Sequence, residues 1–356
     1  MNKKDKSPIG EYRDTAFDSL TKLGDVLPLE APFGIMIDPA NICNFRCMFC
    51  PTGDEKLLES VNRPKGIMRF DLFRKIIDDI KCFDKRIKAL WLLKDGEPFI
   101  NKDLERMISY AKQKRVADEI KTTSNGSLIT RDRAIDIIDA GLDFIRISIE
   151  HVNPEKYREI TRTFSDYERI RKNVEILFRE KEDRGSSLKI HVKIVDVGLS
   201  LEEKNIFIKD FEYISDSLNI ETLMGWSNTS KKDFTLGLEV ELAMSSAAQL
   251  KYDRKVCPEP FKGMAVNFDG QVSVCCVDWS LGTIIGDVSK ENLVDIWNGE
   301  KMYKLRNLHL KGQRNQIECC SDCQFMLGVP SLSDIDDCAE FLIKKYEDRF
   351  VQSDRG

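Results

Sequence analysis

Cysteine is the residue type in this chain with the clearest capacity for chemistry, and its eleven copies are unevenly placed. Cys43, Cys47 and Cys50 lie within eight residues, CNFRCMFC, seven cysteines follow residue 256, and Cys82 stands alone. In a reducing compartment, clustered cysteines bind metals or do redox chemistry more often than they form disulfides. We therefore expect two sulfur centres, one near each end of the chain.

The spacing C-x3-C-x2-C of the first cluster limits what it can bind. Three thiolates could hold zinc with a distant fourth ligand, or three irons of a 4Fe-4S cluster. Asp54 and Glu55 are the only close candidates for completing a zinc site. A cluster with three protein ligands leaves one iron with an open position, where chemistry can take place.

Alternating strand-like and helix-like segments must position these cysteines. Apolar runs typical of strands occupy 34–38, 89–93, 144–149 and 188–195, with weaker candidates at 119–124 and 219–226. The segments between them carry helical periodicity, as in residues 72–80. This order predicts an α/β fold with about six β/α units, a partial (β/α)6 TIM-like barrel. The first cysteines would lie in the loop at the carboxyl end of the first strand, where barrel active sites are built.

Local signals refine this expectation. Asn153 before Pro154 predicts a capped helix start, and Ser165 with Glu168 fits a capping box. After about residue 245 the pattern changes, because AVNFDGQVSV predicts a hairpin around Asp269-Gly270 and residues 292–308 predict one helix. We expect an arm at 1–30, a core domain at 31–245, and a small α+β cysteine-rich domain at 246–356.

Two of the predicted strands carry polar residues on one face. A parallel strand covered by helices is normally apolar on both faces, so a polar face indicates a lumen that holds a ligand. A solvent-facing edge strand is the alternative, and we favour the lumen because two strands within the series share the feature. The residues concerned are Arg146, Ser148, Glu150, Lys189, His191 and Lys193.

Composition and charge exclude other classes of protein. With 42% hydrophobic residues and a net charge of -5, the chain has enough apolar mass for a core and no basic arm for nucleic acid. It contains no run of 18 apolar residues, and MNKKDKSPIGEYRD lacks the apolar core of a signal peptide. We expect a cytoplasmic protein with no membrane and no nucleic-acid partner.

The first cluster resembles the signature of the radical SAM superfamily, with Cys43, Cys47 and Cys50 as the three cysteines and Phe49 as the aromatic residue before the last. The resemblance implies that the open iron binds S-adenosylmethionine (SAM) through its amino and carboxylate groups. Reduction then cleaves SAM to methionine and a 5'-deoxyadenosyl radical, which abstracts hydrogen from a C–H bond. A low-potential electron donor such as flavodoxin or ferredoxin is the implied partner.

The resemblance covers about residues 33 to 230 and implies roles for further residues. Gly96 and Glu97 belong to an Asp95-Gly96-Glu97-Pro98 loop like the family's SAM-binding loop, with Asp95 in place of a glycine. Asn125-Gly126 could instead be an ordinary turn, and Gly96 could simply end a strand. His191, Lys193 and Asp196 are candidates for binding SAM or accepting a substrate proton, with a structural role as the alternative. The implied SAM contacts are Gly96, Glu97, Ser124, Asn125, Ser148 and Glu150.

The later cysteines contain enough ligands for a second, closed site around zinc or a 4Fe-4S cluster. Their arrangement resembles the SPASM/twitch extension of the same family. Because QFMLGVPSLS after Cys323 contains no cysteine, the four-cysteine twitch form with one auxiliary cluster fits better than the full SPASM pattern. Cys276 and Cys319 are adjacent competitors, and Cys82 and Cys338 are expected to be buried as small apolar residues. The expected ligands are Cys257, Cys275, Cys320 and Cys323.

A cluster with four protein ligands has no open iron, so we expect it to accept an electron from a substrate radical. The net reaction would be a two-electron oxidation of a sugar, nucleotide-sugar or cyclitol hydroxyl, by resemblance to twitch dehydrogenases of aminoglycoside biosynthesis. Peptide or protein modification is the first alternative, although an arm of about 30 residues is short for the N-terminal peptide-binding domain of such enzymes. A noncatalytic iron-sulfur or zinc scaffold is the second.

Overall fold

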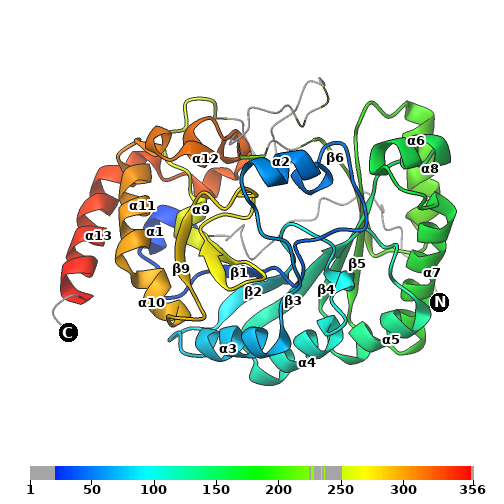
Figure 1. Cartoon of the computed structure of the whole chain (residues 1–356), viewed down its shortest axis with the longest axis horizontal. Helices are drawn as coiled ribbons and strands as arrows, with labels where there is room; N and C mark the ends of the chain where they lie inside the picture. Colours follow the sequence, from blue (N-terminus) through cyan, green and yellow to red (C-terminus); the bar gives the residue numbers. More distant parts are fainter. Residues whose placement is uncertain (1–20, 224–225, 228–233, 235, 237–250, 354–356) are drawn as a thin grey trace.

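The computed structural model of the chain describes residues 21–223, 226, 227, 234, 236 and 251–353. Its centre is one nine-stranded sheet in the order β6-β5-β4-β3-β2-β1-β7-β8-β9. The strands from β1 to β6 are parallel and curve into an open half-barrel (Figure 1). They are β1 (Gly34–Ile37), β2 (Ile87–Leu92), β3 (Ala117–Ser124), β4 (Phe144–Ile149), β5 (Lys189–Val195) and β6 (Ser217–Glu221).

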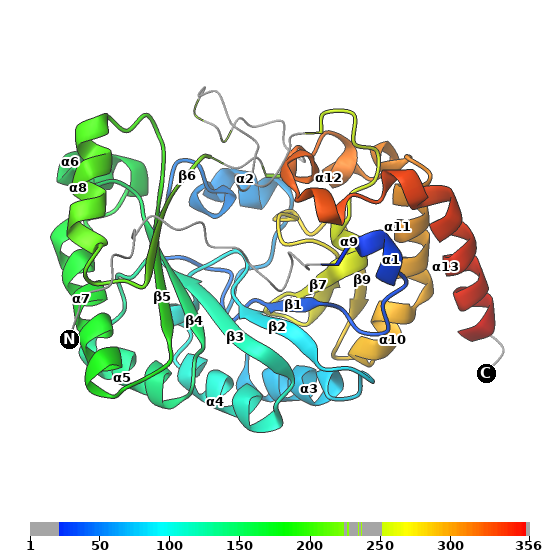
Figure 2. The ribbon, with the colours of Figure 1, turned by 180° about the vertical axis from the view of Figure 1, so that it is seen from behind.

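Helices connect successive parallel strands and cover the convex face of the sheet (Figures 1 and 2). The isoleucines of β4, Ile145, Ile147 and Ile149, point to these helices and belong to the main core, with Val174 and Leu177 opposite them. The helices of this part are α2 (Glu55–Ser60), α3 (Phe70–Ile80), α4 (Leu104–Lys114), α5 (Arg131–Asp139), α6 (Pro154–Thr161), α7 (Tyr167–Asp183) and α8 (Leu201–Phe211). The predicted α/β partial barrel is confirmed.

The opposite, concave face of the same strands is polar. Arg146 lies beside His191 in the β4–β5 register, and Ser148 lies beside Lys193. The Arg146 Nε donates to Thr123 Oγ1 of β3 at 3.2 Å, so polar groups of three neighbouring strands meet on this face. The two strands with a polar face lie inside the sheet, which agrees with the lumen interpretation rather than with an edge strand.

The cysteine-rich part continues the same sheet. Strand β7 (Gly263–Val266) pairs in parallel with β1, and the predicted hairpin turns at Gly270, whose φ of +96° favours glycine. The hairpin strand β8 (Gln271–Ser273) and then β9 (Ile284–Asp287) complete the sheet. The helices here are α9 (Glu259–Lys262), α10 (Leu293–Asn298), α11 (Glu300–Leu310), α12 (Glu318–Ser321) and α13 (Ala339–Ser353).

Three local predictions differ from the structure or fall partly outside it. The single helix expected at 292–308 is two helices, because Gly299 is extended and starts α11 anew. The cap of α7 is Asp166, which accepts from the Glu168 amide, and not Ser165. The boundary expected at residue 245 and residues 1–20 of the expected arm lie outside the described residues.

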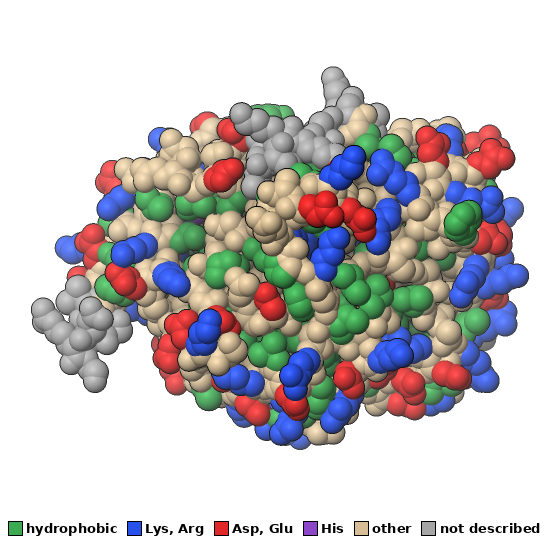
Figure 3. Space-filling view, in the orientation of Figure 1, with side chains coloured by type: hydrophobic (Ala, Val, Ile, Leu, Met, Phe, Trp, Pro, Cys, Tyr) green, Lys and Arg blue, Asp and Glu red, His purple; other side chains and the backbone are tan. Residues whose placement is uncertain are grey.

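The two ends of the described chain pack together. Helix α1 (Leu23–Val26) contributes Leu23 to a small core that also contains Leu342 and Tyr346 of α13. Over the face drawn in Figure 3, acidic and basic side chains are interspersed. Among the described helices, none has the length and apolar character needed to cross a membrane.

Candidate active site

The loop after β1 brings the first three cysteines together at the carboxyl end of the parallel strands. Backbone hydrogen bonds from Arg46 to Thr161 at 2.9 Å and from Met48 to Ile160 at 3.0 Å fix this loop against the end of α6. Gly53 allows the loop to close, because a Cβ there would lie 2.4 Å from the Cys47 carbonyl oxygen. The sequence therefore builds a defined cradle around Cys43, Cys47 and Cys50.

The three thiols lie in surroundings that favour their neutral form. Burial and the charge of Glu97 raise the pKa of Cys43 to about 12. Burial, followed by the charge of Glu150, raises the pKa of Cys47, and burial raises the pKa of Cys50. A bound metal cation reverses this balance, since it stabilises thiolates directly.

Glu97 is the centre of a buried hydrogen-bond group beside Cys43. Its carboxylate accepts from Ser124 Oγ at 2.9 Å, from the Asn125 amide at 2.8 Å and from the Phe99 amide at 3.1 Å. Burial raises its pKa to about 7. The Asn125 Nδ2 lies 3.9 Å from Cys43 Sγ and donates to Asn44 Oδ1 at 2.9 Å. The structure thus gathers three of the predicted SAM contacts next to the first cysteine.

Gly96 is required by the close approach of two loops. A Cβ at this position would lie 2.1 Å from the Ala40 carbonyl oxygen and 2.4 Å from that of Ile42. The neighbouring Glu97 amide donates to the Ile42 carbonyl at 3.0 Å. The Gly96-Glu97 turn therefore packs directly against the chain that leads into Cys43.

The predicted residues of β4 and β5 lie on the concave face. Burial raises the pKa of Glu150 to about 7, an effect that the charge of Lys193 partly offsets. Lys193 itself forms an ion pair with Glu221 of β6 at 2.8 Å. His191 Nδ1 lies 2.8 Å from Ser217 Oγ, and burial together with Arg146 lowers the pKa of His191 to about 4.

Asp196, the third candidate near β5, forms its contacts with the residues that follow it in the chain. Its carboxylate accepts from the Gly198 and Leu199 amides and pairs with Lys204 at 2.6 Å. These bonds shape the turn that leads into α8. Of the three candidates, the structure places only Lys193 in electrostatic contact with a predicted SAM residue, Glu150.

A buried ion cluster next to this site was not anticipated from the sequence. Asp95 pairs with Arg63 at 3.0 Å and with Lys94, and all three side chains are at most 2% exposed. Lys94 Nζ also donates to the carbonyl oxygen of Asp278, in the cysteine-rich part, at 3.0 Å. Thr52 Oγ1 donates to the Asp95 carbonyl at 2.6 Å. The unusual Asp95 of the loop therefore joins the first cysteine loop to the later domain.

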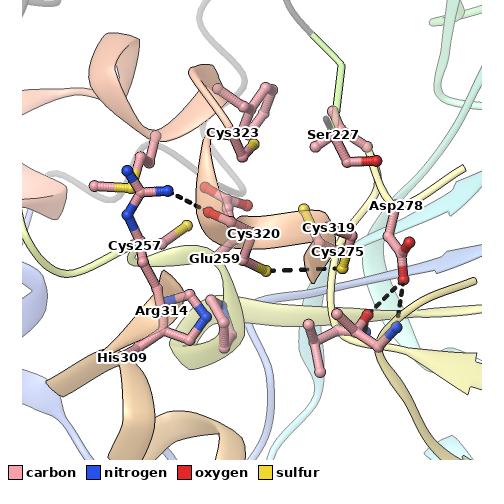
Figure 4. A pocket seen from close by; sticks show the side chains of 16 residues that line it. Ser227, Cys257, Glu259, Cys275, Asp278, His309, Arg314, Cys319, Cys320 and Cys323 are labelled. Atoms are coloured by element: carbon pink, nitrogen blue, oxygen red, sulfur yellow. Dashed lines mark hydrogen bonds between the residues drawn. The ribbon is translucent and has the colours of Figure 1, made fainter. Parts of the chain in front are cut away.

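The later cysteines line a cavity between the loop after β8 and the helices α9, α11 and α12 (Figure 4). Cys276 is not part of its lining, whereas the buried Cys319 is. The Sγ atoms of Cys319 and Cys320 are 4.0 Å apart, so both remain candidates for one position. The thiols of the cavity are those of Cys257, Cys275, Cys319, Cys320 and Cys323.

Other polar groups shape this cavity. The Asp278 carboxylate accepts from the Gly282 amide at 2.9 Å and from the Thr283 amide at 2.8 Å, which fixes the loop after Cys275. Arg314 donates to the Cys320 carbonyl. Burial raises the pKa of Cys323 to about 11 and, with the charge of Glu259, that of Cys257. As in the first site, the thiols are suited to a cationic cofactor.

The two isolated cysteines differ from each other. Cys338 packs against the small core of α1 and α13 but is only partly buried, whereas it was predicted to be buried. Cys82 is exposed, so the prediction that it is buried was wrong. It lies in the turn after α3, two residues beyond Ile80, the last residue of the helix.

Comparison with known families agrees with both sites. The profile described as Radical SAM superfamily matches residues 37–192, and the SPASM profile, described as an iron-sulfur cluster-binding domain, matches residues 257–324. The GTP 3',8-cyclase of Brucella ovis is 25% identical over 278 residues, which cover 72% of this chain and 68% of that protein.

Solved structures show the same fold. The structure of native anSMEcpe with bound AdoMet has a TM-score of 0.59 and 13% identity, covering 90% of this chain and 99% of that one. Streptococcus suis SuiB bound to S-adenosylmethionine has a TM-score of 0.59 and 15% identity, covering 80% and 70%. BtrN in complex with AdoMet and 2-DOIA has a TM-score of 0.50 and 16% identity, covering 82% and 92%.

Sequence profiles, fold and thiol chemistry lead to the same conclusion. Both profiles occur in the order that the sequence predicts, on the parts of the chain that carry the two groups of thiols. The cofactors are accordingly SAM, a 4Fe-4S cluster that binds SAM, and auxiliary iron-sulfur binding in the C-terminal part. The chain therefore carries a radical SAM domain followed by a C-terminal SPASM domain, the domain order of a radical SAM enzyme.

Proposed function

We propose that this enzyme oxidises a hydroxyl group of a small molecule rich in hydrogen-bond donors, of the sugar, nucleotide-sugar or cyclitol type. Cys43, Cys47 and Cys50 would hold the SAM-binding cluster, and Cys257, Cys275, Cys320 and Cys323 the auxiliary one. When bound, these cofactors supply a hydrogen-abstracting radical from SAM and an acceptor for the electron released on oxidation. The protein itself would position SAM and the substrate, shield the radical from solvent and select the substrate.

The observation that carries this proposal is the direct junction between the two thiol sites. Lys94 follows β2, two residues before Gly96, and its ammonium group reaches the Asp278 carbonyl. Asp278 in turn lines the auxiliary cavity. A rigid, water-excluding junction of this kind suits an enzyme in which a radical is made at one site and its electron is taken up at the other.

The substrate class is inferred from acceptor groups that face the concave side. Asp38 and Asn267 follow directly after Ile37 and Val266, which are paired in the β1–β7 register. Ile37 and Val266 belong to the core on the helix side, so the next residues project from the opposite face.

Asn267 offers an acceptor that the described residues leave unused, and Asp38 offers a buried carboxyl that already contacts the Asp95 backbone. Among the described residues, no group donates to Asn267 Oδ1, whereas a hydrogen bond from the Asp95 backbone lowers the pKa that burial raises at Asp38. The Asn267 Nδ2 is already bonded to the Gln271 carbonyl at 2.9 Å. Buried acceptors without donors are costly, so a ligand that donates hydroxyl or ammonium hydrogens is favoured.

The same acceptors weigh against an anionic group at this position. The similar GTP 3',8-cyclase of Brucella ovis is named for a nucleoside triphosphate, whose phosphates offer acceptors only. The Asn267 Oδ1 atom offers such a group no hydrogen, and Asp38 in its ionised form would repel it. Peptide modification remains the second candidate, because SuiB, whose fold is similar, has also been solved bound to its precursor peptide SuiA. A peptide can donate N–H groups.

A deuterium-transfer experiment tests the proposal. The reconstituted enzyme is supplied with SAM, a reductant and one of three probes: perdeuterated myo-inositol, D-glucosamine or D-glucose 6-phosphate. We expect deuterium in 5'-deoxyadenosine, and a carbonyl product, from the neutral or cationic probes and not from the phosphate. Transfer only from D-glucose 6-phosphate, or from none of the three probes, would contradict the proposed substrate class.

A further inference from the structure

His309 is a buried imidazole in the wall of the auxiliary cavity. It lies in the last turn of α11 and is 1% exposed. Figure 4 shows its ring at the edge of the cavity, near Cys257 and Arg314. Neither the four-cysteine arrangement nor the family profile gives this residue a role, because the thiols alone are sufficient to hold a cluster.

Both ring nitrogens of His309 are without a hydrogen-bond partner among the residues that the structure describes. A neutral imidazole carries one N–H donor and one acceptor, so at least one donor is unused whichever tautomer is present. The nearby Arg314 cannot help, since a guanidinium offers only donors. Buried polar groups nearly always form hydrogen bonds in native proteins. A buried imidazole without a partner in the wall of a cofactor cavity therefore indicates that the cofactor is its partner.

The position of His309 is fixed from behind. Arg306, one turn earlier on α11, donates to the Pro260 carbonyl at 3.0 Å and to the Trp297 carbonyl at 3.1 Å. Its guanidinium also lies 4.0 Å from the centroid of the Trp297 ring. These contacts hold α11 against α9 and α10, so the imidazole cannot easily turn away from the cavity.

We propose that His309 donates a hydrogen bond to a sulfur of the auxiliary iron-sulfur cluster and thereby raises its reduction potential. A donor to a cluster sulfur stabilises the more negative, reduced state, and such hydrogen bonds are among the factors that set cluster potentials. Burial lowers the pKa of His309 to about 4, so the donor is a neutral imidazole. A higher potential makes the cluster a better electron acceptor; only this last consequence rests on the proposed function.

Two substitutions in the full-length chain separate this role from a structural one. His309→Leu removes the donor, and His309→Gln keeps an N–H. We expect the auxiliary midpoint potential, measured by EPR-monitored redox titration without substrate, to shift negative in His309→Leu and to shift less in His309→Gln. The SAM-binding cluster of the same sample is the internal control, and its potential should not change.

The apoprotein gives a second measurement. Replacing an unsatisfied buried polar group by an apolar one of similar size is neutral or stabilising, so cofactor-free His309→Leu should unfold at the same or a higher urea concentration than wild type. A histidine that served the fold would give the opposite result.

Three outcomes would overturn the proposal. These are an unchanged auxiliary potential in His309→Leu at full iron content, nitrogen hyperfine coupling that makes His309 a direct iron ligand, and a wild-type protein with no second cluster signal. Because no substrate is used, failure of the proposed oxidation would leave this result unaffected.

Discussion

At the scale of single residues, Gly96 is the position where the SAM side of the enzyme tolerates least change. An added Cβ would meet two backbone carbonyl oxygens, at 2.1 and 2.4 Å, and neither can rotate away. We expect Gly96→Ala to lower the free energy of unfolding by about 3 kcal/mol and to reduce SAM cleavage at least tenfold. Urea denaturation of the apoprotein and assay of 5'-deoxyadenosine measure the two effects.

Gly185 provides the control for this substitution. It lies in an exposed turn before β5 with φ of +61°, and a Cβ there would meet no atom within 4 Å. Gly185→Ala should therefore cost only about 1 kcal/mol of backbone strain and leave SAM cleavage intact. Equal losses of SAM cleavage in the two variants would show that the close approach at Gly96 has no special role.

The buried carboxyl of Asp38 should make the stability of the fold depend on pH. Burial, together with the charge of Asp95, raises its pKa, while Lys94 and Arg63 partly oppose this. The folded state therefore binds the proton more tightly than the unfolded state, and stability falls as pH rises above the unfolded pKa of about 4. Once the carboxyl ionises, every tenfold tightening of proton binding in the folded state costs about 1.4 kcal/mol of stability.

Asp38→Asn removes this ionisation. Relative to wild type, we expect the variant to gain stability between pH 4 and pH 8, measured by urea denaturation at both values. Asp118→Asn, which removes an exposed carboxylate paired with Arg86, is the control and should show little change with pH. If the difference in the free energy of unfolding between Asp38→Asn and wild type did not change with pH, Asp38 would ionise with an ordinary pKa.

The spacing of the cysteines was sufficient to predict the two groups of thiols because it is local, whereas the Glu97 loop was expected only from the resemblance to the radical SAM superfamily. Residue types in the sequence could not predict Asp38, Lys94 or His309 as parts of a site. The roles of these three depend on partners, or missing partners, far away in the chain. Asp95 was visible as a departure from the family loop, but its partner Arg63 follows from the fold.

At the scale of elements, the loop after β2 is the joint between the two parts of the enzyme. Lys94→Met would keep the apolar stem but remove the ammonium that binds Asp95 and the Asp278 carbonyl. Because Arg63 still compensates Asp95, we expect a loss of about 2 kcal/mol in the free energy of unfolding. The loop fixed by Asp278 should also exchange its amide hydrogens faster, at Gly282 and Thr283.

Lys290→Met is the matched control for this joint. Lys290 pairs with Asp287 on the surface, with a side chain that is 77% exposed, so its removal should cost under about 1 kcal/mol. Hydrogen exchange at Gly282 and Thr283 should remain as in wild type. If Lys94→Met also left these amides protected, the loop after β2 would not be the joint that holds the auxiliary cavity.

The order of elements in the core was readable from periodicity, because each strand and helix is marked by its own apolar pattern. Two features were not readable. Continuous helical periodicity hid the break at Gly299, and the pairing of β7 with β1 joins segments more than 200 residues apart. The hairpin itself was local and was predicted correctly around Gly270.

At the scale of the whole molecule, one sheet carries two cofactor sites of different kinds. The sheet runs without interruption from β6 to β9, so the core and the cysteine-rich part share a backbone framework. The first site has three cysteines and the second cavity has five thiols in its wall. We propose that the first is open to SAM and the second closed.

The most direct test of this claim is SAM cleavage by the anaerobically reconstituted, reduced enzyme and two multiple variants. Wild type should contain about eight irons and form 5'-deoxyadenosine. The variant C257A/C275A/C320A/C323A should keep about half the iron and still cleave SAM, while C43A/C47A/C50A should form none. Cleavage that persists without Cys43, Cys47 and Cys50 would contradict the assignment of the open site.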